Sequence, residues 1–271
     1  MRGFKIIIVL LISSFILLSS AIAEEGRLMR FPDIHKDKIV FVYAGDLWLV
    51  SSQGGIARRL TTHEGLELFP KFSPDGEWIA FTAQYDGNTD VYIIPSEGGE
   101  PKRLTFYPGF ENTSERHGFD DMVLGWHPDN QKVLFRSWRD SHNGWFQRLF
   151  TVNKEGGFPE VLPLPEGGLT CFSPDGDKIA YNRIFRNFRT WKRYKGGLAQ
   201  DIWIYDLKKN KIERITDYEG TDTYPMWHQD RIYFGSDRDH TMNIFFYDLS
   251  TKKIKRVTDH QEFDVNWPSL G

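Results

Sequence analysis

Within short segments of this chain, apolar residues occur at every second position, and turns separate these segments. A polar residue followed by alternating aromatic and aliphatic residues recurs five times, at intervals of about 42 to 58 residues. The five copies are residues 46–50, 90–94, 147–152, 201–205 and 243–247. Such alternation predicts half-buried β-strands. A self-similar unit of this length is typical of the blades of a β-propeller.

Each copy has similar neighbours on both sides. Four copies lead into a strand that ends in a basic residue, an aliphatic residue and Thr, whereas the third copy degenerates to Val161-Leu162-Pro163. The four regular endings are residues 59–61, 103–105, 214–216 and 256–258. Before every copy but the first, an aromatic residue precedes a turn of the Ser-Pro-Asp-Gly kind, and another strand follows. These turns are residues 73–76, 127–130, 173–176 and 228–230. Pro, Asp and Gly favour tight hairpins, so each unit should contain four antiparallel strands.

A lone four-stranded sheet cannot bury both of its faces, so the units should stack around a common axis. We expect an all-β fold: a β-propeller of four-stranded antiparallel blades over residues 24–271, with five blades and the first strand of a sixth. The expected blades span about residues 30–62, 66–106, 121–163, 168–216 and 222–258, and the partial sixth spans 262–271. Phe263–Pro268 matches the first strand of the fifth blade, Thr223–Trp227. No segment predicts a long amphipathic helix.

The first 23 residues predict a signal peptide. Arg2 and Lys5 precede a long apolar run, which ends in small residues that include Ala21 and Ala23. This pattern predicts cleavage after Ala23 and therefore an exported protein, periplasmic or extracellular. The alternative is an uncleaved membrane anchor, which needs about 20 apolar residues.

The composition of the chain limits its possible partners and the source of its stability. The formal net charge of −3 does not indicate a nucleic-acid partner. The single cysteine, Cys171, cannot form an internal disulfide, and its apolar neighbours favour a buried, unreactive thiol. Stability must therefore come from packing, for which 9 Trp, 11 Tyr and 21 Phe are available.

No catalytic motif is present. The chain has neither the Gly-x-Ser-x-Gly pattern of a hydrolase nucleophile nor the His-Glu-x-x-His or Cys-His spacing of a zinc site. We expect no catalytic residue, no metal and no cofactor. Asp86, Asn88 and Asp90 have the alternate spacing that begins a calcium loop, and Glu97 lies where the loop would end. The strand predicted from residue 91 onward favours a hairpin turn instead.

Longer segments resemble a known family. Residues 39–50, and residues 69–76 followed by 85–92, resemble the first two blades of the N-terminal, six-bladed propeller of tricorn-type serine proteases, and residues 188–197 resemble its fourth blade. The Ser-Pro-Asp-Gly turns alone also occur in TolB-like proteins and in prolyl oligopeptidase relatives. The resemblance to the tricorn-type proteases covers essentially all of residues 24–271.

The resemblance implies a non-catalytic module of a larger exported serine peptidase, truncated before the catalytic region. Its partners would be the missing downstream domains of the same polypeptide, and peptides or unfolded polypeptide that it guides or filters for proteolysis. The alternative is a TolB-like envelope propeller that acts as a protein–protein interaction module. Formation of a homo-oligomer stays open, and nucleic acid is not expected as a partner.

Two segments hold candidate substrate-binding residues. Residues 183–195 interleave basic and aromatic side chains, and Arg186, Arg189 and Arg193 could attract peptide carboxylates at the mouth of the propeller. The alternative is a packed loop whose charges are solvated. Residues 106–121 form a long connection that contains Arg116 and His117. The resemblance implies that paired arginines anchor a substrate's C-terminal carboxylate in this region. His117 at the second position would weaken this anchor or make it pH-dependent.

Overall fold

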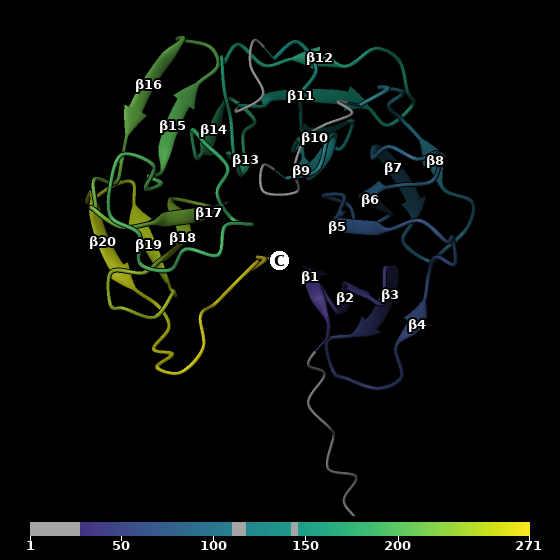
Figure 1. Ribbon diagram of the computed structural model, residues 1–271, viewed down its shortest axis with the longest axis horizontal. Coiled ribbons are helices and arrows are strands. Elements are labelled where there is room, and N and C mark those ends of the chain that lie inside the picture. The colour runs from purple at the N-terminus through teal and green to yellow at the C-terminus, as the bar shows by residue number, and fades with distance from the viewer. Residues whose placement is uncertain (1–27, 110–117, 142–145) are drawn as a thin grey trace, which may run out of the picture.

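A computed structural model describes residues 28–109, 118–141 and 146–271 of the chain, which form an all-β ring (Figure 1). Its twenty strands form five four-stranded antiparallel sheets. The expected fold class, a β-propeller of four-stranded blades, is therefore confirmed. The predicted signal peptide and its cleavage site at Ala23 lie outside the described residues. The described part of the chain contains no helix that is long and apolar enough to cross a membrane.

The strands are numbered in chain order, four to a blade. Blade one contains β1 (Arg30–His35), β2 (Lys38–Tyr43), β3 (Asp46–Ser51) and β4 (Arg58–Arg59). Blade two contains β5 (Glu67–Phe72), β6 (Trp78–Ala83), β7 (Asp90–Pro95) and β8 (Lys102–Arg103). Blade three contains β9 (Met122–Trp126), β10 (Lys132–Ser137), β11 (Arg148–Asn153) and β12 (Glu160–Val161). Blade four contains β13 (Thr170–Phe172), β14 (Lys178–Tyr181), β15 (Trp203–Asp206) and β16 (Lys211–Arg214). Blade five contains β17 (Asp222–His228), β18 (Arg231–Ser236), β19 (Asn243–Asp248) and β20 (Lys253–Arg256).

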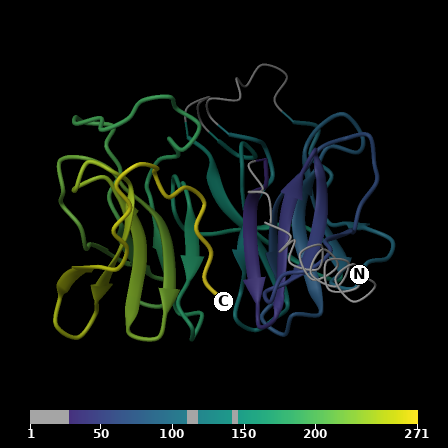
Figure 2. The same ribbon diagram turned by 90° about the horizontal axis from the view of Figure 1, so that it is seen from below.

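In every blade the strands pair in chain order, and the first strand lies nearest the axis (Figure 1). The turns between first and second strands therefore lie on one face of the ring, which we call the turn face. The loops between second and third strands, and the connections between blades, lie on the opposite face, which we call the loop face (Figure 2). In the turn after β5, Ser73 Oγ donates to Asp75 Oδ1 at 2.5 Å and Gly76 takes a φ of 77°. This is the local chemistry that the sequence predicted for such turns.

Three first strands carry the same irregularity. Phe31 in β1, Phe69 in β5 and Tyr224 in β17 each precede a proline and take a positive φ, of 51°, 55° and 56°. The pairing register of each strand shifts at this point, as it does in a β-bulge. All three rings enter one core cluster at the centre of the ring.

The segment after blade five differs from the prediction. Residues 262–271 form no strand, although we expected the first strand of a sixth blade there. The physical reason is that no described segment supplies the neighbouring strand with which it would pair. Trp267 nevertheless takes a φ of 52° before Pro268, like the aromatic residues of the bulges. The segment runs to the axis between blades five and one (Figure 1), and Gly271 lies against Ile34. The described residues thus form five complete blades, and the six-blade count is not confirmed.

Aromatic rings fill the centre of the ring, and we call this group the axial cluster. Its members are Phe31, Phe69, Phe119, Phe185, Phe188, Tyr224 and Trp267. The Trp267 ring lies 4.9 Å from that of Phe31, 5.4 Å from Phe69 and 5.3 Å from Tyr224, measured between centroids. Rings at such distances attract one another beyond the burial of their surface. The axial cluster therefore joins blades one, two and five to the C-terminal segment.

Candidate functional site

Two pockets lie on opposite sides of the axial cluster. The pocket toward the turn face has a volume of about 250 Å³, and the first strands of all five blades line it together with residues 267–270. Cys171 belongs to its wall. Burial raises the pKa of this thiol to about 12, so at neutral pH Cys171 is not a reactive thiolate.

The pocket on the loop face is larger, about 440 Å³, and we call it the upper pocket. It lies between the loop that joins β14 to β15, the start of β17, the loop after β18 and residues 262–266. Arg186, Arg189 and Arg193 all line it, so the structure brings these three sequence-predicted residues together. The other two, Arg116 and His117, lie outside the described residues.

One side of the upper pocket is cationic and aromatic. The guanidinium carbons of Arg186 and Arg189 lie 5.6 Å and 5.5 Å from the Trp191 ring centroid, and Trp191 stacks on Tyr194 at 5.2 Å. Within the described ranges, Arg186 makes no ion pair with a carboxylate. Partial burial, and then the nearby charge of Arg189, lower the pKa of Arg186. An uncompensated guanidinium beside a half-exposed aromatic ring is suited to hold a carboxylate.

Two other basic side chains of the same loop hold it in place. Arg193 Nε donates to the carbonyl oxygen of His240 at 2.9 Å. Lys192 Nζ lies 2.6 Å from Asp264 Oδ2, and Asp264 Oδ1 accepts from the Met242 N–H at 3.0 Å. These contacts tie the loop to blade five and to the C-terminal segment. Arg193 therefore positions the pocket, and Arg186 is better placed than Arg193 for a ligand.

Sequence reasoning missed the acidic side of the upper pocket. Asp237, in the loop after β18, lines the pocket and is 7% exposed. Its Oδ1 accepts from the Thr221 N–H at 2.8 Å, and it makes no ion pair with any described residue. Burial, together with the charges of Asp222 and Asp264, raises its pKa. One sequence signal could have pointed to this loop. Ser236-Asp237-Arg238 resembles Ser137-Trp138-Arg139, and each tripeptide begins at the last residue of the second strand of its blade.

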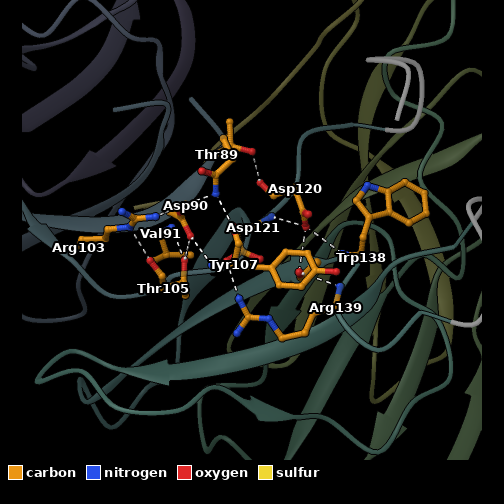
Figure 3. Close-up of polar contacts among 12 residues, drawn as sticks. Thr89, Asp90, Val91, Arg103, Thr105, Tyr107, Asp120, Asp121, Trp138 and Arg139 are labelled. Carbon is orange, nitrogen blue, oxygen red and sulfur yellow. Dashed lines mark hydrogen bonds and ion pairs between the residues drawn. The ribbon is translucent and has the colours of Figure 1, made fainter. Parts of the chain in front are cut away.

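A second cluster of buried charges lies between blades two and three (Figure 3). Asp121 is fully buried and Arg139 Nη2 lies 3.1 Å from its Oδ2. Asp120 Oδ1 accepts from Ser137 Oγ and from the Trp138 N–H, both at 2.9 Å. Burial, and then the charge of Asp120, raise the pKa of Asp121 to about 7. Adjacent carboxyl groups with such a shift are also what an acid–base site would contain.

Similar contacts recur at the junctions of other blades, so this cluster has a structural role. In four blades, the Thr two residues after the end of the fourth strand accepts from a backbone N–H near the start of the third strand at 2.9 Å, and the Arg that ends the fourth strand donates to the carbonyl oxygen of this Thr. The four Arg and Thr pairs are Arg59 and Thr61, Arg103 and Thr105, Arg214 and Thr216, and Arg256 and Thr258. A buried acid begins the next blade three times, as Glu67, Asp121 and Asp222. A repeated arrangement of this kind joins blades and needs no ligand.

The calcium alternative finds no support in the contacts. Asp90 accepts from Arg103 Nη2 at 2.6 Å and from Thr105 Oγ1 at 2.9 Å, and the Asp86 carboxylate pairs with Arg103. These carboxylates therefore already belong to the junction between blades. Among the residues that the structure describes, no group of three or more His, Cys, Asp or Glu side chains could hold a metal ion.

Comparisons with known proteins agree with the fold. Residues 26–271 match the family described as the tricorn protease N-terminal beta propeller domain. The chain is 28% identical over 218 residues to a tricorn protease homolog of Saccharolobus solfataricus, an alignment that covers 79% of this chain and 19% of the relative. The chain therefore spans about a fifth of the length of that relative.

Two solved structures are similar in architecture. The crystal structure of the tricorn protease matches with a TM-score of 0.77 and 27% identity, over 89% of this chain and 23% of that chain. A putative TolB from Agrobacterium tumefaciens matches with a TM-score of 0.66 over 84% of this chain and 80% of that chain, but at 20% identity this likeness shows the fold alone. Because the matched family covers almost the whole chain, the chain belongs to the tricorn protease N-terminal β-propeller family.

Proposed function

We propose that this chain is a non-catalytic propeller module of a tricorn-type serine peptidase, and that it binds peptides on their way to or from a catalytic region elsewhere in the polypeptide. The observation that carries the proposal is the upper pocket, in which Arg186 and Arg189 flank Trp191 on the loop face of the ring. Membership of the tricorn protease N-terminal family supports the link to proteolysis.

The pocket favours peptides for a physical reason. Guanidinium groups recognise carboxylates through paired hydrogen bonds, and aromatic rings take up apolar side chains. A peptide offers both groups on one flexible chain. The axial cluster fills the ring below the pocket, so a bound peptide rests on its rings and does not pass straight along the axis.

The remaining parts of the function are proposals on the same basis. The module works together with downstream domains of a longer polypeptide, and the signal-like residues 1–23 direct it to the periplasm or the exterior. The TolB-like alternative, an envelope propeller that binds a protein partner, rests on shared fold only, and no contact in the described residues favours it.

Peptide binding is tested with the purified chain and fluorescein-labelled peptides of about 4 to 10 residues, read by fluorescence anisotropy. We expect saturable binding that weakens about tenfold or more, or about 1.4 kcal/mol, in the variant with Arg186→Gln and Arg189→Gln. Lys195→Gln is the matched control, because it removes a charge from the same loop but from a side chain that pairs with Glu219 at the surface.

Two results would contradict the proposal. One is a lack of saturable binding by the unmodified chain, and the other is equal binding by the double Arg variant. Turnover of the peptides that a serine-reactive inhibitor abolishes would contradict the non-catalytic part of the proposal alone.

A further inference from the structure

The upper pocket contains two opposite charges that the fold leaves uncompensated. Arg186 and Asp237 both line it, and within the described residues neither has an ion-pair partner. The pKa of Arg186 is lowered and that of Asp237 raised, in both cases chiefly by burial. Each shift means that the charged form lacks a compensating neighbour.

The neighbouring charges of opposite sign are already engaged. Arg238 Nη2 lies 2.9 Å from both carboxylate oxygens of Asp222. Lys192 pairs with Asp264, and Lys195 pairs with Glu219. Asp237 is therefore the buried acid of the pocket that is left for a cation from outside, just as Arg186 is left for an anion.

The walls between the two charges are suited to apolar groups. Trp191 is 52% exposed and Phe263 is 79% exposed, and both line the pocket. Tyr224 closes the pocket toward the axial cluster. A volume of about 440 Å³ is within the range of about 300 to 1,000 Å³ that is usual for small-ligand pockets.

We infer that the upper pocket binds short peptides with free ends, holding the terminal carboxylate at Arg186 with Arg189 and the terminal ammonium at Asp237. This inference rests on the proposed function and names its ligand class. Polyanions such as nucleotides are disfavoured, because they would bring negative charge toward Asp237 without an ammonium group to neutralise it. A long unfolded chain offers one terminus to such a site, whereas a short product peptide offers both.

The test is isothermal titration of the chain with one tripeptide, Ala-Phe-Ala, in three forms: unblocked, N-acetylated and C-amidated. We expect the unblocked form to bind about tenfold more tightly than either blocked form. Asp237→Asn should reduce the affinity for the unblocked form to that of the acetylated form and leave the acetylated form unchanged. Arg186→Gln should do the same with respect to the amidated form. This pairing of variants with blocked ligands isolates each contact.

The controls separate binding from folding. An Asn at position 237 retains an oxygen that can accept from the Thr221 N–H, so Asp237→Asn should keep its circular dichroism spectrum and melting temperature. Lys195→Gln should bind all three forms as the unmodified chain does. If the three forms bind equally, the inference is wrong and the proposed peptide-binding function stands. If neither these nor the longer labelled peptides bind, both are wrong.

Discussion

Blades two and five begin with a buried acid in the same place but give it different partners. Asp222, at the start of β17, receives both of its contacts from Arg238, at 2.9 Å each. Glu67, at the start of β5, has Tyr85 at the position that Arg238 occupies in blade five, and it also accepts from Thr61 Oγ1 at 3.1 Å. Both acids are 0% exposed. One junction therefore contains a buried ion pair, and the other a carboxyl group with neutral partners.

The difference shows that the backbone of the blade fixes a place for an acid but not its charge state. Burial without a strong cationic partner raises the pKa of Glu67 to about 7. At Asp222, by contrast, Arg238 Nη2 places a cation 2.9 Å from both carboxylate oxygens. The two junctions should therefore respond differently to loss of the partner and to pH.

The largest effect is expected from Arg238→Gln. This change leaves the Asp222 carboxylate buried without its cation, and removal of one partner of a buried pair costs about 3 to 5 kcal/mol. Urea unfolding followed by tryptophan fluorescence measures the change in the free energy of unfolding. Arg231→Gln, at an exposed arginine 3.9 Å from Asp248, is the control and should cost under about 1 kcal/mol. Equal costs for the two variants would refute the distinction.

A smaller effect is expected from Tyr85→Phe. The hydroxyl whose interaction lowers the pKa of Glu67 is lost, while the ring, which packs 4.6 Å from the ring of Tyr92, stays. Loss of one hydrogen bond to a buried acid should cost about 1 to 3 kcal/mol at pH 8, where the carboxylate is charged. The same urea experiment at pH 5 should give a smaller cost. A larger cost at pH 5 than at pH 8 would contradict this account.

The smallest effect, and the most specific one, is expected from Glu67→Gln at low pH. The pKa of Glu67 in the folded chain is about 7, above its ordinary value of 4.5, so the folded state holds the proton more tightly than the unfolded state. Stability should therefore fall as the pH rises from about 4.5 to 7. The variant should match the unmodified chain within about 1 kcal/mol at pH 5 and become the more stable of the two at pH 8. Parallel melting curves across this range would show that Glu67 does not titrate there.

The repeat could be read from the sequence because its causes are local. Alternation of apolar residues predicts each strand, and the turn at Ser73–Gly76 predicts its own hairpin. Even the degenerate third copy forms β12, because the Leu162 N–H can still donate to the Leu149 carbonyl oxygen whatever side chains it carries. Local chemistry therefore accounted for the five blades.

The upper pocket was only partly predictable, because its other walls come from distant parts of the chain. The basic and aromatic residues around Trp191 formed a visible run, but Asp237 and Asp264 lie far from it in sequence. Nothing local distinguishes a paired Arg193 from an Arg186 without a carboxylate. Residues 262–271 form no strand because the described chain contains no neighbouring strand for them to pair with. A local sequence pattern cannot predict this.

The axial cluster changes how this repeat protein should lose its structure. In a linear array each repeat interacts only with the next one, so melting can begin at an end and spread. Here the Trp267 ring contacts Phe31 of the first blade and Tyr224 of the fifth blade, so the axial cluster links the two ends of the array. Fraying of the first or the fifth blade would break contacts in the axial cluster, so the five sheets should melt together as a single cooperative unit.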